Sequence, residues 1–402
     1  MALKKKINNL LTEDVLFLLE HIEKNGYEAR LVGGAVRNCL MDVEPTDIDI
    51  AITATPTETT RIFGNVHGIK VVPTGIDYGT VTVVRNWKSY EITSLRKDVQ
   101  TFGRKALVQF TNSFEEDSRR RDFTINAIYV DKNGNIFDYH RGIDDISRKN
   151  IRFIGCPEER IKEDFLRILR YFRFVVCYGN GVINEEYLAL INSLKSNVVI
   201  LSTERILAEL LTMLGNSDSY KIIPDMKPVL DVLFDLACDP LETASQLNIF
   251  AKMTAVERLC LLLKFSKRPD LTSKYKFPRI ISQMLALNVD NYAGSAIKRK
   301  LKTIRKNLRH FLVQYASVLA YRSEAKSVLE IKNTAQQMED FCRSEYVDFA
   351  FRAGDLGSQC FSQPELKELM MAVKNFWLNS ENDVGREECL RFALKHLETT
   401  AS

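Results

Sequence analysis

Leu31-Val-Gly-Gly-Ala-Val-Arg37 is the stretch around which the rest of the 402-residue chain is organised, and Asp47-Ile-Asp49 follows it closely. The order of residue types predicts a strand end, a glycine-rich turn, a short helix and a second strand. Glycine lets the backbone approach a ligand, helix-opening N–H groups favour an anion, and Arg37 adds a phosphate-binding fork. We therefore expect Gly33, Gly34 and Arg37 to bind phosphate.

Two carboxylates follow on the second strand. Because side chains alternate along a strand, Asp47 and Asp49 share one face, with Ile48 and Ile50 on the other. Paired carboxylates beside a phosphate cradle suit Mg²⁺ and phosphoryl chemistry. Each signal also has an ordinary interpretation, since a Gly-Gly turn is usually only a tight connection and Asp-x-Asp is often a strand exit or a helix cap.

The whole chain has the composition of an ordinary soluble protein, with 45% hydrophobic and 27% charged residues. A net charge of only +4 means that any nucleic-acid affinity must come from local clusters. The eight cysteines form no Cys-x-x-Cys pair, which argues against a zinc ribbon or a disulfide framework. With no signal peptide and no apolar run long enough to span a bilayer, we expect a cytoplasmic protein without a membrane partner.

The segment after the carboxylates is rich in strand signals. Runs at Thr80–Val84 and Ser89–Ser94 flank Arg85-Asn-Trp-Lys88 and predict a hairpin. The second run carries Glu91, either a third carboxylate of the site or a solvated strand residue. Leu95–Asp117 is polar and lacks periodicity, so it predicts a long mobile loop, which in a compact domain is usually functional or disordered.

Strand signals disappear from Pro157 onward. Helical patterns follow one another, including Pro157–Cys177, Glu185–Leu194 and Thr203–Leu214. The sequence therefore predicts an α+β protein, with a mixed head of about 150 residues followed by an all-α remainder.

The first of these helices carries Asp164 and Arg167, three residues apart, with Arg170 one turn further along. A carboxylate beside a guanidinium offers one acceptor and a set of donors. Cytosine and adenine both present an amine next to a ring-nitrogen acceptor, whereas uracil and guanine reverse that pattern and would leave both groups unpaired. The pair thus favours CTP and ATP, unless it is an ordinary ion pair on a solvated helix face.

Two further clusters are basic. Arg120 and Arg121 could grip a triphosphate and Asp122 could accept from a ribose hydroxyl, although a charged surface turn would look the same. Residues 297–309 contain seven basic side chains and no acidic ones, which favours contact with an RNA backbone. The seven are Lys298, Arg299, Lys300, Lys302, Arg305, Lys306 and Arg309.

Taken together, residues 27–215 resemble the class II CCA-adding tRNA nucleotidyltransferase and bacterial poly(A) polymerase family, within the polymerase-β-like nucleotidyltransferase superfamily. Five motifs agree in order, and chance agreement of all five is remote. They are Leu31–Arg37 with Asp47 and Asp49, Arg120–Ala127, Asp138–Arg152 with Gly142 and Asp145, Glu163–Arg167, and Glu204–Glu209.

The resemblance implies a catalytic head at 1–150 with a five-stranded, mostly antiparallel sheet. A helical neck at 151–215 and a tRNA-binding body and tail at 216–402 would follow. It implies Asp47 and Asp49 as ligands of a catalytic Mg²⁺, with Glu91 near the attacking hydroxyl. Nucleotide-binding roles fall to Gly33, Gly34, Arg37, Arg121, Asp122, Asp164, Arg167, Arg170 and Arg173, and a supporting role for the templating helix to Glu204, Arg205 and Glu209.

The implied function is template-independent addition of CCA to tRNA 3′ ends from CTP and ATP, with release of pyrophosphate; no protein partner is indicated. The alternatives are an A-adding enzyme, a poly(A) polymerase, and a tRNA-binding protein that has lost catalysis. One departure lies in the first motif, where the family usually has Asp after the arginine and this chain has Asn38.

Overall fold

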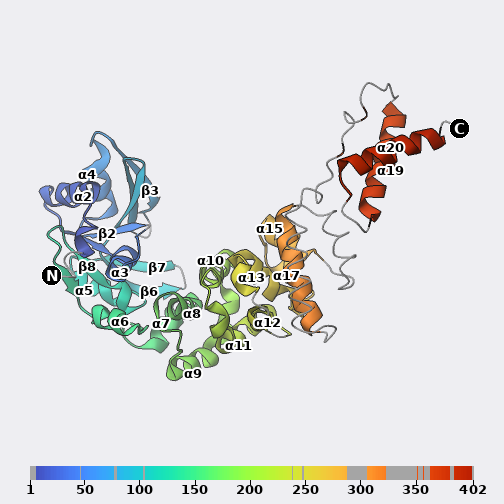
Figure 1. The fold of residues 1–402 in the computed structure, drawn as a ribbon. Coiled ribbons are helices and arrows are strands. Elements are labelled where there is room, and N and C mark those ends of the chain that lie inside the picture. Colours follow the sequence, from blue (N-terminus) through green and yellow to red (C-terminus); the bar gives the residue numbers. More distant parts are fainter. Residues whose placement is uncertain are drawn as a thin grey trace. The chain divides into compact units, whose positions relative to one another are not determined.

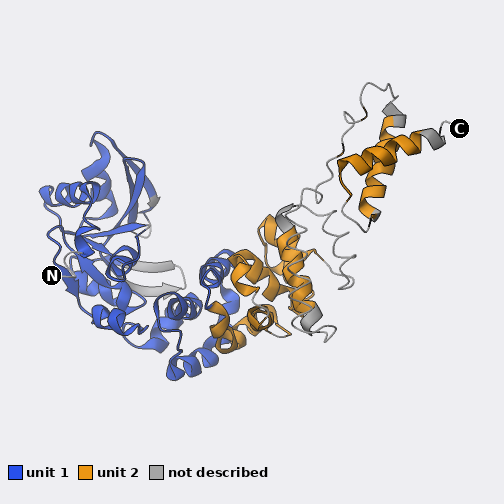
Figure 2. Ribbon diagram, in the orientation of Figure 1, with its two compact units in different colours: residues 1–218 blue, residues 219–402 orange. Residues whose placement is uncertain are grey.

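The structure is a computed structural model that describes residues 6–45, 47–76, 79–102, 105–237, 239–246, 249–287, 306–322, 351, 356, 363–380 and 384–400. The chain divides into two compact units, residues 1–218 and residues 219–402 (Figure 2). The head, neck and body boundaries at 150 and 215 stay a prediction.

The first unit is built on a mixed sheet that has seven strands in its described residues, not the predicted five (Figure 1). The strand order is β3-β4-β5-β2-β1-β8-β9. Only the pairing of β2 with β5 is parallel, so the expectation of a mostly antiparallel sheet is confirmed. The strands are β1 (Ala29–Val32), β2 (Ile48–Ile52), β3 (Ile69–Gly75), β4 (Thr80–Arg85), β5 (Lys88–Ser94), β8 (Ile128–Val130) and β9 (Ile136–Asp138).

Helices cover one face of this sheet. They include α2 (Glu13–Lys24), α3 (Gly34–Leu40) and α4 (Pro56–Gly64). Their apolar stripes meet the alternate strand residues Leu31, Ile50 and Ile92 in one buried core. The caps agree with the sequence: Thr12 accepts from the Val15 N–H, and Thr55 with Glu58 forms a capping box. The residues of the opposite parity, Asp49 and Glu91 among them, therefore point to the other face.

The prediction of a long mobile loop at Leu95–Asp117 is wrong. The chain there forms a two-stranded ribbon, β6 (Arg96–Phe102) and β7 (Lys105–Phe110), followed by α5 (Phe114–Arg119). The ribbon pairs with itself and forms a separate sheet, and its register shifts between Asp98 and Gln100. A shift of one residue breaks the alternation of side chains, which is why periodicity did not reveal these strands.

The helix predicted at Pro157–Cys177 is also corrected. It is two helices, α7 (Pro157–Glu163) and α8 (Leu166–Tyr178), and Asp164 between them is extended, with φ −153° and ψ 106°. Two helices packed beside α8 complete this part, α9 (Glu185–Leu194) and α10 (Thr203–Leu214), and α6 (Gly142–Arg148) precedes it. The break removes Asp164 from the helical face that it was expected to share with Arg167.

The second unit is helical throughout its described residues, as predicted, and none of the described helices is long and apolar enough to cross a membrane. Of the basic stretch, residues 298–305 lie outside the described residues. Arg309 corrects the expectation that all these side chains face RNA, because it is only 5% exposed. The helices are α11 (Ile223–Phe234), α12 (Pro240–Gln246), α13 (Ala255–Lys264), α14 (Leu271–Lys274), α15 (Arg279–Leu285), α17 (Lys306–Arg322), α19 (Gln363–Asn379) and α20 (Arg386–Thr400).

Gly142 tests the packing between α6 and the sheet. A Cβ at this position would lie 2.4 Å from the Thr124 carbonyl oxygen, so the backbone of one segment must move. We expect Gly142→Ala to lower the free energy of unfolding by about 2 kcal/mol in urea melts followed by circular dichroism. Gly64→Ala is the matched control, because a Cβ there meets nothing within 4 Å. An equal loss of unfolding free energy in both variants would contradict the close packing at Gly142.

Candidate active site

The glycine turn brings charged groups against the backbone. β1 ends at Val32, and Gly33 adopts φ +79° before α3 begins at Gly34. A Cβ on Gly33 would lie 3.1 Å from Asp49 Oδ2 and 3.8 Å from Arg121 Nη1. Glycine is required here on two counts, since both the left-handed conformation and the close approach of a carboxylate exclude a side chain.

Three carboxylates lie near one another at this turn. Asp49 on β2 is in parallel register with Glu91 on β5, and Asp47 directly precedes β2. Burial, with the nearby Glu91 and Asp47 charges, raises the pKa of Asp49 to about 6, although Arg121 opposes the shift. In the described parts of the chain no three His, Cys, Asp or Glu side chains form a complete metal site. Crowded carboxylate oxygens that are costly to ionise together nevertheless fit a hard divalent cation.

Arg37 is buried under the turn, and neutral groups hold it. Its Nη1 donates to Asn126 Oδ1 at 2.6 Å, while Nε and Nη2 donate to Asn38 Oδ1 at 3.1 and 2.8 Å. The guanidinium also lies 3.8 Å from the ring centroid of Tyr178. Burial lowers the pKa of Arg37 from its usual value. With amide oxygens rather than carboxylates as acceptors, the positive charge is positioned but not neutralised.

A chain of hydrogen bonds and ion pairs continues from Asn126 to α8 and α10. Asn126 Nδ2 donates to Asp122 Oδ1 at 2.9 Å, and Arg170 donates to Asp122 Oδ2 from Nε at 2.8 Å. Glu209 on α10 pairs with Arg170 at 3.3 Å and with Arg173 at 2.5 Å. Burial alone would raise the pKa of Asp122, but Arg170 and the hydrogen bonds hold it well below its usual range. Both Asp122 oxygens thus accept from protein donors in this structure.

Asp164 and Arg167 do not pair with each other. Asp164 accepts from Arg205 Nη2 at 2.6 Å and from the Leu166 N–H at 3.1 Å. Arg167 Nη1 donates to Glu163 Oε2 and to the Arg160 carbonyl, both at 2.6 Å. The simple intrahelical ion pair is therefore excluded. Each side chain is oriented by its own partners. The acceptor, Asp164, and the donor, Arg167, are therefore held independently of each other at one end of α8.

A cavity of about 740 Å³ joins these groups. All the predicted nucleotide-binding residues line it, together with Asp47 and Asp49, whereas Glu91 lies outside the lining, beside Asp49. The lining also includes Arg205, which the sequence predicted only as a support of the templating helix. It further includes residues that were given no role in the prediction, namely Asn38, Asn126, Leu166, Phe174, Tyr178 and Thr212. Six arginines against four aspartates in the lining favour an anionic ligand.

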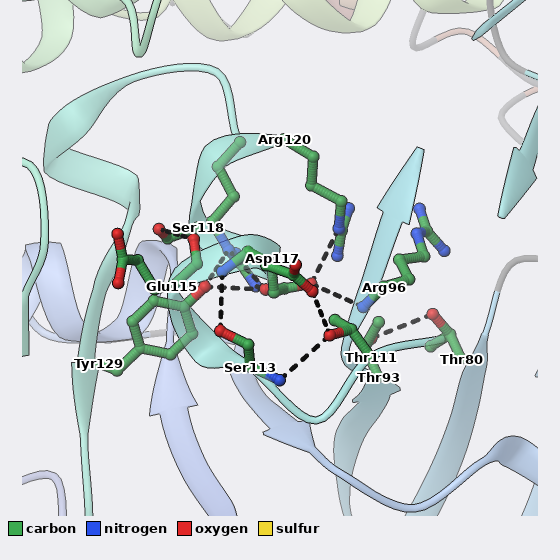
Figure 3. A network of polar contacts seen from close by, with 12 residues as sticks. Thr80, Thr93, Arg96, Thr111, Ser113, Glu115, Asp117, Ser118, Arg120 and Tyr129 are labelled. Carbon is green, nitrogen blue, oxygen red and sulfur yellow. Dashed lines mark hydrogen bonds and ion pairs between the residues drawn. The ribbon is translucent and has the colours of Figure 1, made fainter. Parts of the chain in front are cut away.

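Asp117 is a buried residue that sequence reasoning missed. Figure 3 shows it receiving hydrogen bonds from Arg120 Nε at 2.8 Å, Tyr129 Oη at 2.8 Å and the Arg96 N–H at 3.3 Å. Arg121 Nη2 completes the set at 3.1 Å. Asp117 lies three and four residues before the two arginines on one helical turn, a spacing that could have revealed it. It fixes Arg121 toward the cavity and holds Arg120 away from its lining.

The chain is similar to known proteins both in sequence and in fold. A family model for the poly A polymerase head domain matches residues 29–152. A CCA-adding enzyme of Streptococcus gordonii is 36% identical over 277 residues, which cover 63% of this chain and 68% of that enzyme. The human CCA tRNA nucleotidyltransferase 1, mitochondrial, is 41% identical over 224 residues, covering 54% of this chain and 51% of that protein. The chain spans about half the length of the vertebrate relatives it matches.

Solved structures show the same fold over nearly the whole chain. The Bacillus stearothermophilus CCA-adding enzyme in complex with CTP has a TM-score of 0.71 and 24% identity, with 97% of this chain and 98% of that chain covered. The Thermotoga maritima CCA-adding enzyme complexed with tRNA has a TM-score of 0.66 and 18% identity, with 98% and 96% covered. The sheet with its carboxylates thus belongs to a head domain of the poly A polymerase type, and helices follow it. The chain belongs to the CCA-adding enzyme family.

The Asp117 cluster sets a pH dependence. Burial favours the neutral acid, but Arg121 and Arg120 overcome it and lower the pKa of Asp117 to about 2. A lowered folded-state pKa stabilises the fold above the unfolded value near 4, and this contribution disappears as the pH falls through about 2. We expect Asp117→Asn to cost about 2 kcal/mol of unfolding free energy at pH 7, with the difference from wild type narrowing below pH 4.

Glu115→Gln is the control for this measurement, because Glu115 lies on the same helix and its side chain is 52% exposed. An exposed ion pair should change the unfolding free energy by less than about 1 kcal/mol. A difference in unfolding free energy between wild type and Asp117→Asn that does not change with pH would contradict the lowered pKa of Asp117.

Proposed function

We propose that this protein adds C, C and A to the 3′ ends of tRNA without a nucleic-acid template, using CTP and ATP and releasing pyrophosphate. The observation that carries the proposal is the single cavity that joins a phosphate-binding turn, two carboxylates and an oriented acceptor–donor set. The names of the relatives support it, since several are CCA-adding enzymes.

The turn and the arginines would bind the triphosphate. Gly33 and Gly34 allow the phosphates to approach the backbone, and Arg37 offers a charge that amides orient without neutralising it. Arg121, fixed by Asp117, faces the same space. Burial alone would lower the pKa of Arg121, but Tyr129 and Asp117 hold it above the usual value. Arg170 and Arg173 add positive potential, while Asp122 orients Arg170 near the ribose.

Asp47 and Asp49 would hold a divalent cation, and their oxygen donors suit Mg²⁺. When bound there, Mg²⁺ would supply the charge stabilisation that in-line phosphoryl transfer requires. Glu91, in register with Asp49, lies where it can accept a hydrogen bond from the attacking 3′-hydroxyl. The hydroxyl attacks the α-phosphorus, the bond to the bridging oxygen of pyrophosphate breaks, and the hydroxyl proton leaves to solvent.

Base selection falls to Asp164 and Arg167. The Asp164 carboxylate, oriented by Arg205, would accept from the exocyclic amine of C or A, while Arg167 donates to the adjacent ring nitrogen. UTP and GTP would place a carbonyl oxygen against the Asp164 carboxylate and an N–H group against the Arg167 guanidinium, so neither contact would form a hydrogen bond. The acceptor and donor need not share a helical face, because separate partners position each of them.

The basic stretch is proposed to contact the tRNA backbone through Lys298, Arg299, Lys302, Arg305 and Lys306. Arg309 is left out of this set because it is buried. A cytoplasmic location stays a prediction; three vertebrate relatives carry mitochondrial in their names.

The deciding experiment supplies CTP and ATP, separately and together, to a tRNA transcript that lacks its CCA end, and then sequences the products. We expect CC with CTP alone and CCA with both. Long A tails would instead identify a poly(A) polymerase, and addition of A only to tRNA ending in CC would identify an A-adding enzyme. Binding of tRNA with no incorporation would identify a non-catalytic binding protein.

Asp49→Asn tests the carboxylate pair. Loss of one charge should lower kcat by at least about 10³-fold, because the transition-state charge loses its counterion, while tRNA affinity stays close to wild type. Glu44→Gln is the matched control, since Glu44 is an exposed acid three residues before Asp47 that does not line the cavity. Turnover of Asp49→Asn at the wild-type rate would contradict the proposed role of Asp49 as a ligand of the divalent cation.

Asp164→Asn tests base selection. Its amide can no longer act as a purely accepting group, so kcat/KM for CTP and ATP should fall about 10- to 100-fold, and discrimination against UTP should weaken. Glu158→Gln, an exposed acid on α7, should leave both values unchanged. The measurement is incorporation from each single nucleotide; unchanged discrimination would exclude Asp164 from base recognition.

A further inference from the structure

The sheet face that carries the carboxylates extends beyond them toward its β3 edge. Register places Thr82 on β4 opposite Glu91, and Val84 opposite Ser89. Lys70 on β3 lies opposite Val84. Glu91, Ser89 and Lys70 are all exposed, whereas the residues of the other parity belong to the core under α2 and α4. A partly exposed surface of polar side chains, interrupted by Val72 and Val84, thus continues from Glu91 across β5, β4 and β3.

Trp87 stands at the end of this surface, at the tip of the β4–β5 hairpin. Asn86 and Trp87 are the two residues of the turn, with φ of +49° and +63°. Turns of this kind usually place glycine at the second position, because a bulky side chain is strained in the left-handed region. Trp87 is nonetheless there and 101% exposed, so its indole gains nothing from burial to offset the strain.

The turn that presents this tryptophan is held rigidly. Asp14 on α2 accepts from Arg85 Nε at 2.8 Å and from Asn86 Nδ2 at 2.7 Å. The Arg85 guanidinium also lies 3.9 Å from the ring centroid of Phe17. An exposed aromatic ring on an anchored, strained turn is preorganised to contact a ligand, since little motion of the backbone has to be lost on binding.

The position of this surface relative to the cavity indicates which ligand the surface binds. In the sheet, β2 lies between β1, which leads into Gly33, and β5, which carries Glu91. The triphosphate cavity lies on the Gly33 side of Asp49, and Glu91 lies on the opposite side. In-line displacement brings the attacking hydroxyl from the side opposite the leaving pyrophosphate. The acceptor strand must therefore approach over β5.

We infer that the exposed face of β5, β4 and β3 binds the single-stranded 3′ end of the RNA acceptor, and that Trp87 stacks on one of its bases. This inference rests on the proposed function. Trp87 lies four residues from Glu91, about 13 Å along the strand, so the stacked base precedes the terminal nucleotide. Ser89 and Thr82 offer hydroxyl donors to the sugar-phosphate backbone, and Lys70 offers positive charge.

The surroundings of Trp87 favour RNA over a protein or a lipid surface. Its neighbours in the hairpin, Asn86, Lys88 and Ser89, are polar and exposed, so the indole is not part of an apolar patch in the described residues around it. Protein interfaces bury several apolar side chains around an aromatic anchor. A single aromatic platform among basic and hydroxyl groups is typical of single-strand recognition.

Trp87→Gly separates this role from a structural one. Glycine relieves the left-handed strain and removes no buried contact, so the thermal midpoint should stay level or rise. The KM for a tRNA ending in CC should rise roughly tenfold, and the KM for CTP or ATP should not change. Trp87→Phe should restore most of the loss. Val182→Ala is the control, because Val182 is also exposed, at 68%, and lies outside the site.

Fluorescence gives a readout that does not require turnover. The chain has two tryptophans, so the difference between wild type and Trp87→Phe isolates the Trp87 signal. We expect quenching by tRNA ending in CC, but none by CTP alone or by tRNA trimmed to a blunt acceptor helix. Nucleotide addition with no quenching and an unchanged acceptor KM would overturn the inference and leave the proposed function standing. Quenching without addition would overturn the function only.

Discussion

The site depends on buried carboxylates that hold arginines in place. Asp117 fixes Arg121, Asp122 fixes Arg170, and Glu209 joins Arg170 to Arg173. A buried guanidinium needs both charge compensation and hydrogen-bond acceptors, and each carboxylate supplies them at one end of an arginine. The other end can then face the cavity. Without these pairs, six arginines could not converge on about 740 Å³ without severe repulsion.

Arg37 is the exception, and its position explains the triphosphate cradle. Asn38 and Asn126 orient it through their amide oxygens, so its charge remains for a ligand. Asn126 also donates to Asp122, which links the glycine turn to α8 through one side-chain amide. The phosphate-binding turn is thereby joined, through Asn126, Asp122 and Arg170, to Glu209 and Arg173 by a continuous set of hydrogen bonds and ion pairs. Such networks hold a unique geometry only when every member is satisfied.

Three irregularities of the first unit lie at the site or at the hairpin proposed to extend it. Gly33 has a left-handed backbone, α7 and α8 are separated by the extended Asp164, and Trp87 occupies a turn position that glycine usually takes. Each is a local departure from what the sequence would adopt by propensity alone, and each places a functional group or a candidate one. The regular elements, by contrast, follow their hydrophobic periods closely, as α2 does with Val15, Leu18, Leu19 and Ile22.

Local pattern by itself determined the α+β class and the helical remainder, because periodicity acts over a few residues. The short motifs predicted residues that the fold brings to one cavity. Tertiary structure decided what depends on distant partners. The β6–β7 ribbon is defined by pairing rather than by alternation, and the extra strands of the sheet are recruited by their neighbours. Asp164 and Arg167 look like a pair on a helix, yet Arg205 holds one and Glu163 the other. The spacing of Asp117 from Arg120 and Arg121 could have indicated a pair. Only the fold buried Asp117 against two arginines and a tyrosine, and the strength of a charge pair depends on the surrounding dielectric.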